Sequence, residues 1–92
     1  MDFDRALALV NDAMSAAFGR LVSDAELALF KGAWYGQTYE VIAEESGYAA
    51  SYFTRIVGPK FWKNLSQALG EKVSKTSFRA AIEKRHRLGE AL

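Results

Sequence analysis

The segment at residues 50–57 carries side chains whose types suit contact with DNA bases. The Arg55 guanidinium can bond guanine bidentately, a contact worth about 1–3 kcal/mol of discrimination. Helical spacing places Ser51, Tyr52 and Thr54 on the outward side beside it. A second set of cations follows the segment and is suited to holding phosphates: Lys60, Lys63, Lys72, Lys75 and Arg79. Together these residues predict a surface for duplex DNA.

The charges of the chain are unevenly distributed. Residues 1–46 hold eight acidic and three basic side chains, whereas residues 47–92 hold three acidic and nine basic ones. The net charge is only +1, so any attraction for phosphate must come from this separation and not from the total. The alternative is that the opposite charges pair within the fold or between copies of the chain.

Enzymatic chemistry has little support in the sequence. The absence of cysteine excludes disulfides, thiolate catalysis and thiolate metal sites. His86, the single histidine, has neither a partner nucleophile nor further metal ligands near it in the sequence. The Ser74-Lys75-Thr76 run lacks the glycines of a phosphate-binding loop, and Glu44 and Glu45 project about 100° apart on a helix. We predict no enzyme activity, no cofactor and no metal site.

Residues 38–57 have the pattern of a helix-turn-helix, which would position the DNA-binding side chains. Ala43 supplies a small residue where two helices meet, and Gly47 suits the left-handed conformation of a tight turn four residues later. The residues expected on the inner faces are Ile42, Tyr48, Phe53 and Ile56. The alternative is a helical hairpin with no role in nucleic-acid binding.

Two helices are predicted before this motif. Residues 3–18 form an amphipathic helix, capped by Asp2 and closed by Gly19. A capping box of Ser23 and Glu26 starts the next helix, which ends near Gly36. Thr38 then caps the first helix of the motif. The inward residues of the two helices are Phe3, Ala6, Leu7, Val10, Met14, Phe18, Leu27, Phe30 and Trp34.

Two further helices are predicted after the motif. Val57-Gly58-Pro59 breaks the periodicity, and a new helix begins there. Residues 70–76 form either a short wing or a plain loop, and the last helix starts at Thr76 or Ser77. It leads into the basic run 84–87 and a frayed end. The expected inward residues are Phe61, Trp62, Leu65, Leu69, Phe78, Ile82 and Leu88.

The resulting fold class is all-α, with about five helices around a helix-turn-helix core, with or without a wing. We expect one domain over residues 1–92, with an N-terminal helix at 1–20, a core at 21–84 and a basic, frayed tail at 85–92. The hydrophobic fraction of 50% and aromatic fraction of 13% support a packed core. No secretory signal and no apolar run of about 18 residues is present, which predicts a cytoplasmic protein without a membrane partner. Nothing resembles a long zipper, so we expect a monomer or weak homodimer.

Two segments carry a resemblance to a known family. They are K-G-A-W-Y-G-Q-T-Y-E-V-I-A-E-E-S-G-Y at residues 31–48 and V-G-P-K-F-W-K-N-L-S-Q-A-L-G-E-K-V-S-K-T-S-F-R at residues 57–79. From Leu21 to about Lys84 the chain resembles the N-terminal helix-turn-helix domain of vWA-MoxR-associated proteins, a family common in cyanobacteria. The resemblance implies a domain that precedes signalling ATPases or other effectors in conflict and signalling systems. No such module follows within 92 residues, so the chain is either an excised N-terminal domain or a stand-alone relative.

Two functional hypotheses follow. The first is a DNA-binding domain, as a transcriptional regulator or as the sensor module of a conflict or signalling system. Residues 50–57 contain a single cation, which is little positive charge for a domain that binds a specific DNA sequence strongly. The second is a protein-protein adaptor that uses the same fold to recruit signalling ATPases or effectors, or to self-associate through oppositely charged faces. An exposed Tyr52 would suit such an interface. The sequence analysis favours duplex DNA over a protein partner.

Overall fold

The computed structural model describes residues 1–90, and within this range the chain forms helices and no strand. The helices are α1 (Phe3–Phe18), α2 (Asp24–Trp34), α3 (Tyr39–Ser46), α4 (Ala50–Tyr52), α5 (Gly58–Leu69) and α6 (Phe78–Glu90), with a π-helical turn, η1 (Phe53–Val57), between α4 and α5. Because α4, η1 and α5 follow one another without a break, the described chain has five helical segments. The all-α prediction is confirmed.

The predicted helix caps are present. The Asp2 carboxylate accepts a hydrogen bond from a backbone N–H in the first turn of α1. At α2 the capping box closes in both directions: the Ser23 N–H donates to Glu26 Oε1 at 2.8 Å, and the Glu26 N–H donates to Ser23 Oγ at 3.2 Å. Thr38 caps α3, and Gly47 ends it with a φ of 82°. These boundaries depend on neighbours in the sequence, so they could be predicted from it.

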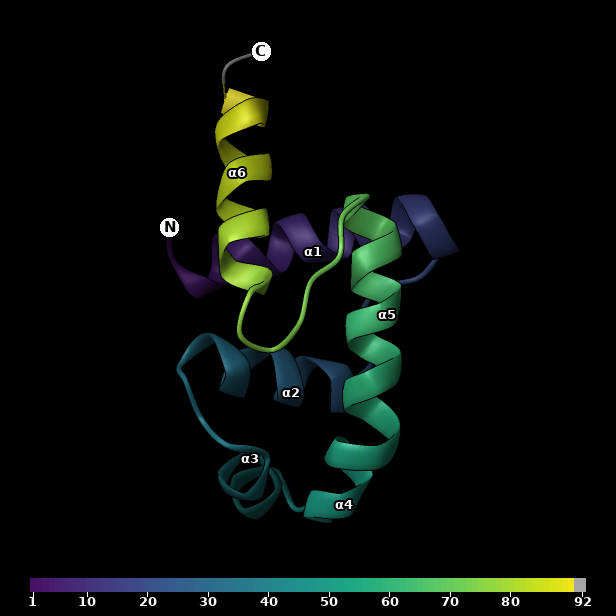
Figure 1. Ribbon diagram of the computed structural model, residues 1–92, viewed down its shortest axis with the longest axis vertical. Coiled ribbons are helices and arrows are strands. Elements are labelled where there is room, and N and C mark those ends of the chain that lie inside the picture. Colours follow the sequence, from purple (N-terminus) through teal and green to yellow (C-terminus); the bar gives the residue numbers. More distant parts are fainter. Residues whose placement is uncertain (91–92) are drawn as a thin grey trace.

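An aromatic core holds α1, α2, α5 and α6 together. The ring of Phe30, which is fully buried, lies 5.6 Å from that of Phe3, 6.1 Å from that of Phe61 and 5.5 Å from that of Phe78. Trp34 packs between Phe30 and Phe78. Figure 1 shows α2 crossing the middle of the molecule, with α1 and α6 beyond one side of it and α3 and α4 beyond the other.

Four apolar residues expected inside the core are exposed instead. They are Phe18 (39% exposed), Tyr48 (38%), Ile56 (58%) and Leu88 (59%). Phe18 and Leu88 lie near helix ends, where no other element covers them fully. Ile56 was predicted three residues after Phe53 on one buried stripe, but in the π-helical turn it is Val57 that turns inward. The exposed Tyr48 and Ile56 both lie at the helix-turn-helix end of the molecule.

At Val57-Gly58-Pro59 the helical periodicity changes and α5 begins, as predicted, but the helical backbone is not interrupted there. The chain stays helical from Ala50 to Leu69, and the Gly58 N–H donates to the Phe53 carbonyl in an i→i+5 bond. Proline in a regular helix clashes with the carbonyl four residues earlier, and a wider π turn is one way to accommodate it. Pro59 then occupies the first turn of α5, where its missing N–H costs little. Figure 1 shows the helix bending at this turn, between α4 and α5.

The contact between α2 and α3 depends on Gly32. A Cβ built on Gly32 would lie 2.2 Å from Cγ1 of Ile42, which is itself 2% exposed. The glycine therefore lets α3 approach α2 more closely than any other residue would. Ala43, the small residue predicted at the helix contact, is also buried, at 5% exposed.

The tyrosine at the start of α3 locks this helix to α5. Trp62 Nε1 donates a hydrogen bond to Tyr39 Oη at 2.9 Å, and the same hydroxyl lies 2.9 Å from where a Cβ on Gly58 would stand. The bare backbone at Gly58 therefore makes room for the tyrosine. This bond fixes the helix-turn-helix against the aromatic core through one side-chain pair.

The segment between α5 and α6 is a loop and not a wing. Val73 is buried and its N–H donates to Ser66 Oγ at 2.9 Å, while the Ser66 hydroxyl donates to the Trp62 carbonyl at 2.7 Å. α6 starts at Phe78 and continues through the basic run 84–87 to Glu90, where a frayed tail was predicted. Residues 91–92 of that tail lie outside the described residues.

Candidate interaction surface on the recognition helix

The residues predicted to contact DNA bases are all exposed. Ser51 and Tyr52 lie on α4, and Thr54 and Arg55 lie on η1. The Thr54 hydroxyl donates to the Ala50 carbonyl at 3.1 Å, so it is partly engaged by its own helix. Within residues 1–90 Arg55 has no ion-pair partner. The recognition helix therefore presents one free cation together with a tyrosine and two hydroxyls.

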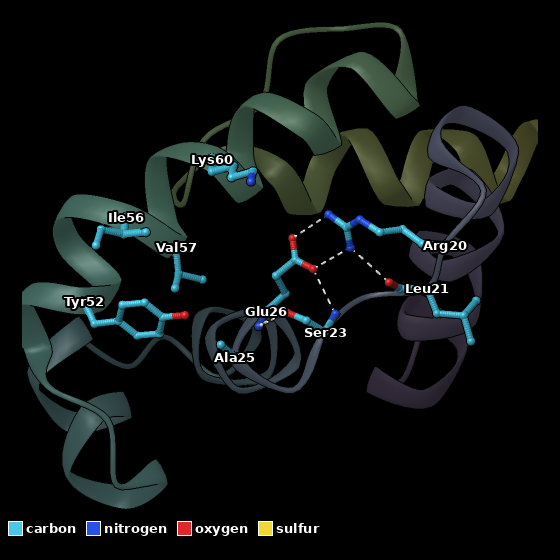
Figure 2. A pocket seen from close by; sticks show the side chains of 9 residues that line it. All are labelled: Arg20, Leu21, Ser23, Ala25, Glu26, Tyr52, Ile56, Val57 and Lys60. Carbon is cyan, nitrogen blue, oxygen red and sulfur yellow. Dashed lines mark hydrogen bonds and ion pairs between the residues drawn. The ribbon is translucent and has the colours of Figure 1, made fainter.

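An apolar groove runs along one side of this helix. It has a volume of about 370 Å³ and lies between η1, the start of α2 and the link that joins α1 to α2. Figure 2 shows the Tyr52 ring reaching toward the start of α2, with Ile56 on the same wall and Leu21 on the opposite side. Ile56 is 58% exposed and Leu21 is 61% exposed. Large apolar side chains are thus left in solvent on both sides of one groove.

An ion pair forms part of the groove floor. Arg20 Nη1 lies 2.7 Å from Glu26 Oε1, and Nη2 lies 3.2 Å from Oε2, so the contact is bidentate (Figure 2). Burial alone would raise the pKa of the Glu26 carboxyl, but hydrogen bonds from Arg20 and Ser23 outweigh it and hold this pKa below its ordinary value. The pKa of Arg20 is raised by the same hydrogen bond. The charges of this pair satisfy each other, which leaves Lys60 as the uncompensated cation of the groove.

The five predicted phosphate contacts do not gather on one surface. Lys60 lines the groove, whereas Lys75 and Arg79 line a second hollow beside Trp34. Lys75 Nζ lies 5.3 Å above the ring of Tyr39, and the Arg79 guanidinium lies 3.7 Å above the ring of Trp34 and 3.9 Å from Glu83.

The other two phosphate candidates lie further along the chain. Lys63 is exposed on α5, and Lys72 is exposed just after its end. The twelve residues of α5 span about 18 Å, so this length of helix separates Lys72 from the recognition helix. Figure 1 shows α4 at one end of α5 and the loop that leads to α6 at the other end.

The helix that precedes the turn is acidic. α3 carries Glu40, Glu44 and Glu45, all exposed, and contains no lysine or arginine. Glu45 accepts a long hydrogen bond from Gln37, but no described residue pairs with Glu40 or Glu44. In DNA-binding helix-turn-helix domains this first helix crosses the phosphate backbone. Carboxylates at that place would repel DNA.

Sequence reasoning missed three parts of this surface. The first is the exposure of Ile56, which the π turn produces and which the spacing of apolar residues does not indicate. The second is Leu21, and the third is the pairing of Arg20 with Glu26 across six residues. Arg20 directly follows the helix-ending Gly19 and stands six residues before the capping-box glutamate. This spacing was the one signal in the sequence for the pair.

The described part of the chain has neither a cluster of metal-ligating side chains nor a helix that could cross a membrane. Across residues 1–90 there is no cluster of three or more His, Asp or Glu side chains that could hold a metal ion. The helices of the same range are either too short or too polar to cross a membrane.

The close pairing of α3 with α4 and η1 across Gly47, supported by α1, α2 and α5, defines the protein as a helix-turn-helix domain. The chain belongs to the family described as vWA-MoxR associated protein N-terminal HTH, which matches residues 1–85. The match includes α1 as well as the segments that carried the resemblance in the sequence. No curated protein matches the chain, and no solved structure does.

Proposed function

We propose that this domain is a protein-interaction adaptor that binds a partner through the groove beside its recognition helix. The observation that carries this proposal is the exposure of Ile56, at 58%, on the helix that a DNA reader would place in the major groove. Tyr52 stands on the same wall, and Leu21 lines the opposite side of the groove. Aromatic and apolar side chains around a depression are typical of the centre of a protein interface.

The charges near the recognition helix also favour a protein over DNA. α3 presents unpaired carboxylates where a DNA-binding domain needs neutral or basic groups, and η1 contributes only Arg55 as a cation. Lys75 and Arg79 already rest on aromatic rings, so to contact phosphate they would have to give up these contacts or share them. The family name associates the domain with vWA and MoxR proteins. A signalling ATPase or effector is therefore the partner class to test first.

A salt titration with duplex DNA separates the two functions. If five basic residues contacted phosphates, the log of the association constant would fall against log salt with a slope of about −4 to −5. Charge reversal at Lys75 and Arg79 would flatten this slope, and Arg55→Ala would relax sequence preference. For an adaptor we expect no sub-millimolar duplex binding, even at low salt. Duplex binding with the steep slope would overturn the proposal.

The adaptor function itself is tested by affinity capture with a nuclease-treated extract of the source cells. We expect the wild-type chain to retain a protein that Ile56→Ser loses, because the substitution removes an exposed apolar contact without disturbing the core. Lys72→Ser is the matched control, since Lys72 is also exposed but lies at the far end of α5. Equal loss with both variants, or capture that occurs only when the nuclease is left out, would count against the groove.

A further inference from the structure

The chain carries a surface that complements its own groove. On the outer side of α3 lie Glu40, Val41 and Glu44, all exposed, with Val41 at 38%. Glu40 and Glu44 are four residues apart on a helix and so project to the same side, with Val41 beside them. This face combines one apolar side chain with two carboxylates that no described residue pairs.

The groove offers the opposite arrangement. Its walls hold Ile56 and Leu21, and its rim holds Lys60, whose ammonium has no ion-pair partner within residues 1–90. Glu26 adds no net repulsion for an acidic partner because Arg20 binds both of its carboxylate oxygens. Lys63 is exposed three residues further along α5. Residues three apart on a helix project to the same side, so Lys63 adds positive charge beside Lys60.

We propose that the domain associates head to tail, with the acidic face of α3 from one copy docked into the groove of the next. This inference rests on the proposed adaptor function and names a second copy of the chain as a partner. Val41 would enter the depression between Ile56 and Leu21, while Glu40 and Glu44 face Lys60 and Lys63. The acidic face and the groove lie on different elements, so a copy that uses one of them keeps the other free for a further copy. Such a heterologous contact extends into open chains or closes into a ring.

The strength and salt dependence of the contact follow from its size. One short helix on one groove makes an interface of the small class, which associates weakly. Its charge pairs are at the rim and exposed, so salt screens them over a Debye length of about 8–10 Å. Self-association should therefore increase with protein concentration and decrease with added salt.

Analytical ultracentrifugation of the full chain tests the inference through charge reversal. Lys60→Glu and Glu44→Lys should each weaken self-association about tenfold or more, because each places like charges opposite one another. An equimolar mixture of the two variants should associate again, since the unaltered acidic α3 face of Lys60→Glu can dock into the unaltered basic groove of Glu44→Lys. The matched controls are Lys72→Glu and Asp12→Lys, which make the same charge changes at exposed positions away from both surfaces. Circular dichroism establishes that every variant is folded.

Three outcomes would overturn the inference. The first is that the wild-type chain stays monomeric at about 1 mM and low salt, where even weak interfaces associate. The second is that the mixture of variants associates no better than each variant alone. The third is that the control variants weaken association as much as the test variants do. If the wild-type chain is monomeric but captures a partner that the Ile56→Ser variant does not capture, self-association is rejected and the adaptor function stands. Steep, salt-dependent duplex binding would reject the adaptor function itself.

Discussion

The two ends of this domain are built on different principles. At one end α1, α2, α5 and α6 surround Phe30, which touches the rings of several other aromatic residues and is fully buried. At the other end α4 is only three residues long, η1 follows at once, and Tyr48, Tyr52 and Ile56 remain exposed. The first end contains the apolar burial that stabilises the fold. The second end leaves apolar surface in solvent, which is where a binding function is expected.

The largest expected effect is on the aromatic end. Phe30→Ala should lower the free energy of unfolding by about 3–5 kcal/mol, because it empties the centre of the ring cluster. That is a large part of the roughly 5–15 kcal/mol that stabilises a typical domain. Ile56→Ser, at the exposed end, should stay within about 0.5 kcal/mol of wild type. Urea denaturation measures both, and similar values for the two variants would contradict the contrast between the ends.

A medium effect is expected where the two ends meet. Gly32→Ala should cost about 1–3 kcal/mol, because the new methyl group would overlap Ile42 and push α3 away from α2. Gly89→Ala is the control: nothing lies within 4 Å of its Cβ position, so it should be neutral or stabilise α6 by up to about 1 kcal/mol. Combining Gly32→Ala with Ile42→Ala should give a total loss smaller than the sum of the two. Strict additivity would show that the two side chains do not meet.

Among the buried positions, the smallest expected effect is at Glu26 on the groove floor, and it depends on pH. The folded state lowers the pKa of Glu26, so its ionised form contributes stability above the ordinary carboxyl pKa, and this contribution is lost as the pH falls through the lowered value. Glu26→Gln keeps a capping-box residue but removes the charge. It should cost about 1 kcal/mol or less near neutral pH, since Arg20 is partly exposed. The difference from wild type should vanish in acid. If Glu26→Gln remains less stable than wild type in acid, the loss of stability comes from packing and not from the charge.

Much of the fold could be predicted because its determinants are local. The caps at Asp2, Ser23 and Thr38 and the turn at Gly47 involve residues within one helical turn of each other, so the sequence pattern contains the whole interaction. The buried stripes of regular helices follow from the same local periodicity. The exposure of the predicted recognition residues could likewise be predicted from helical spacing alone.

What the sequence by itself determined was thus the set of helices, their caps and the class of the domain. Only the tertiary structure decided which apolar residues stay in solvent, because that depends on the π turn and on what packs against each helix. The π turn carries the chain past Pro59 without a break, and Ile56 remains outside while Val57 turns inward. Through-space neighbours also placed Lys75 and Arg79 on aromatic rings and joined Arg20 to Glu26. The contacts of Lys75 and Arg79 bring together residues from separate elements, so no local pattern encodes them, and the spacing of Arg20 and Glu26 does not by itself show that they pair.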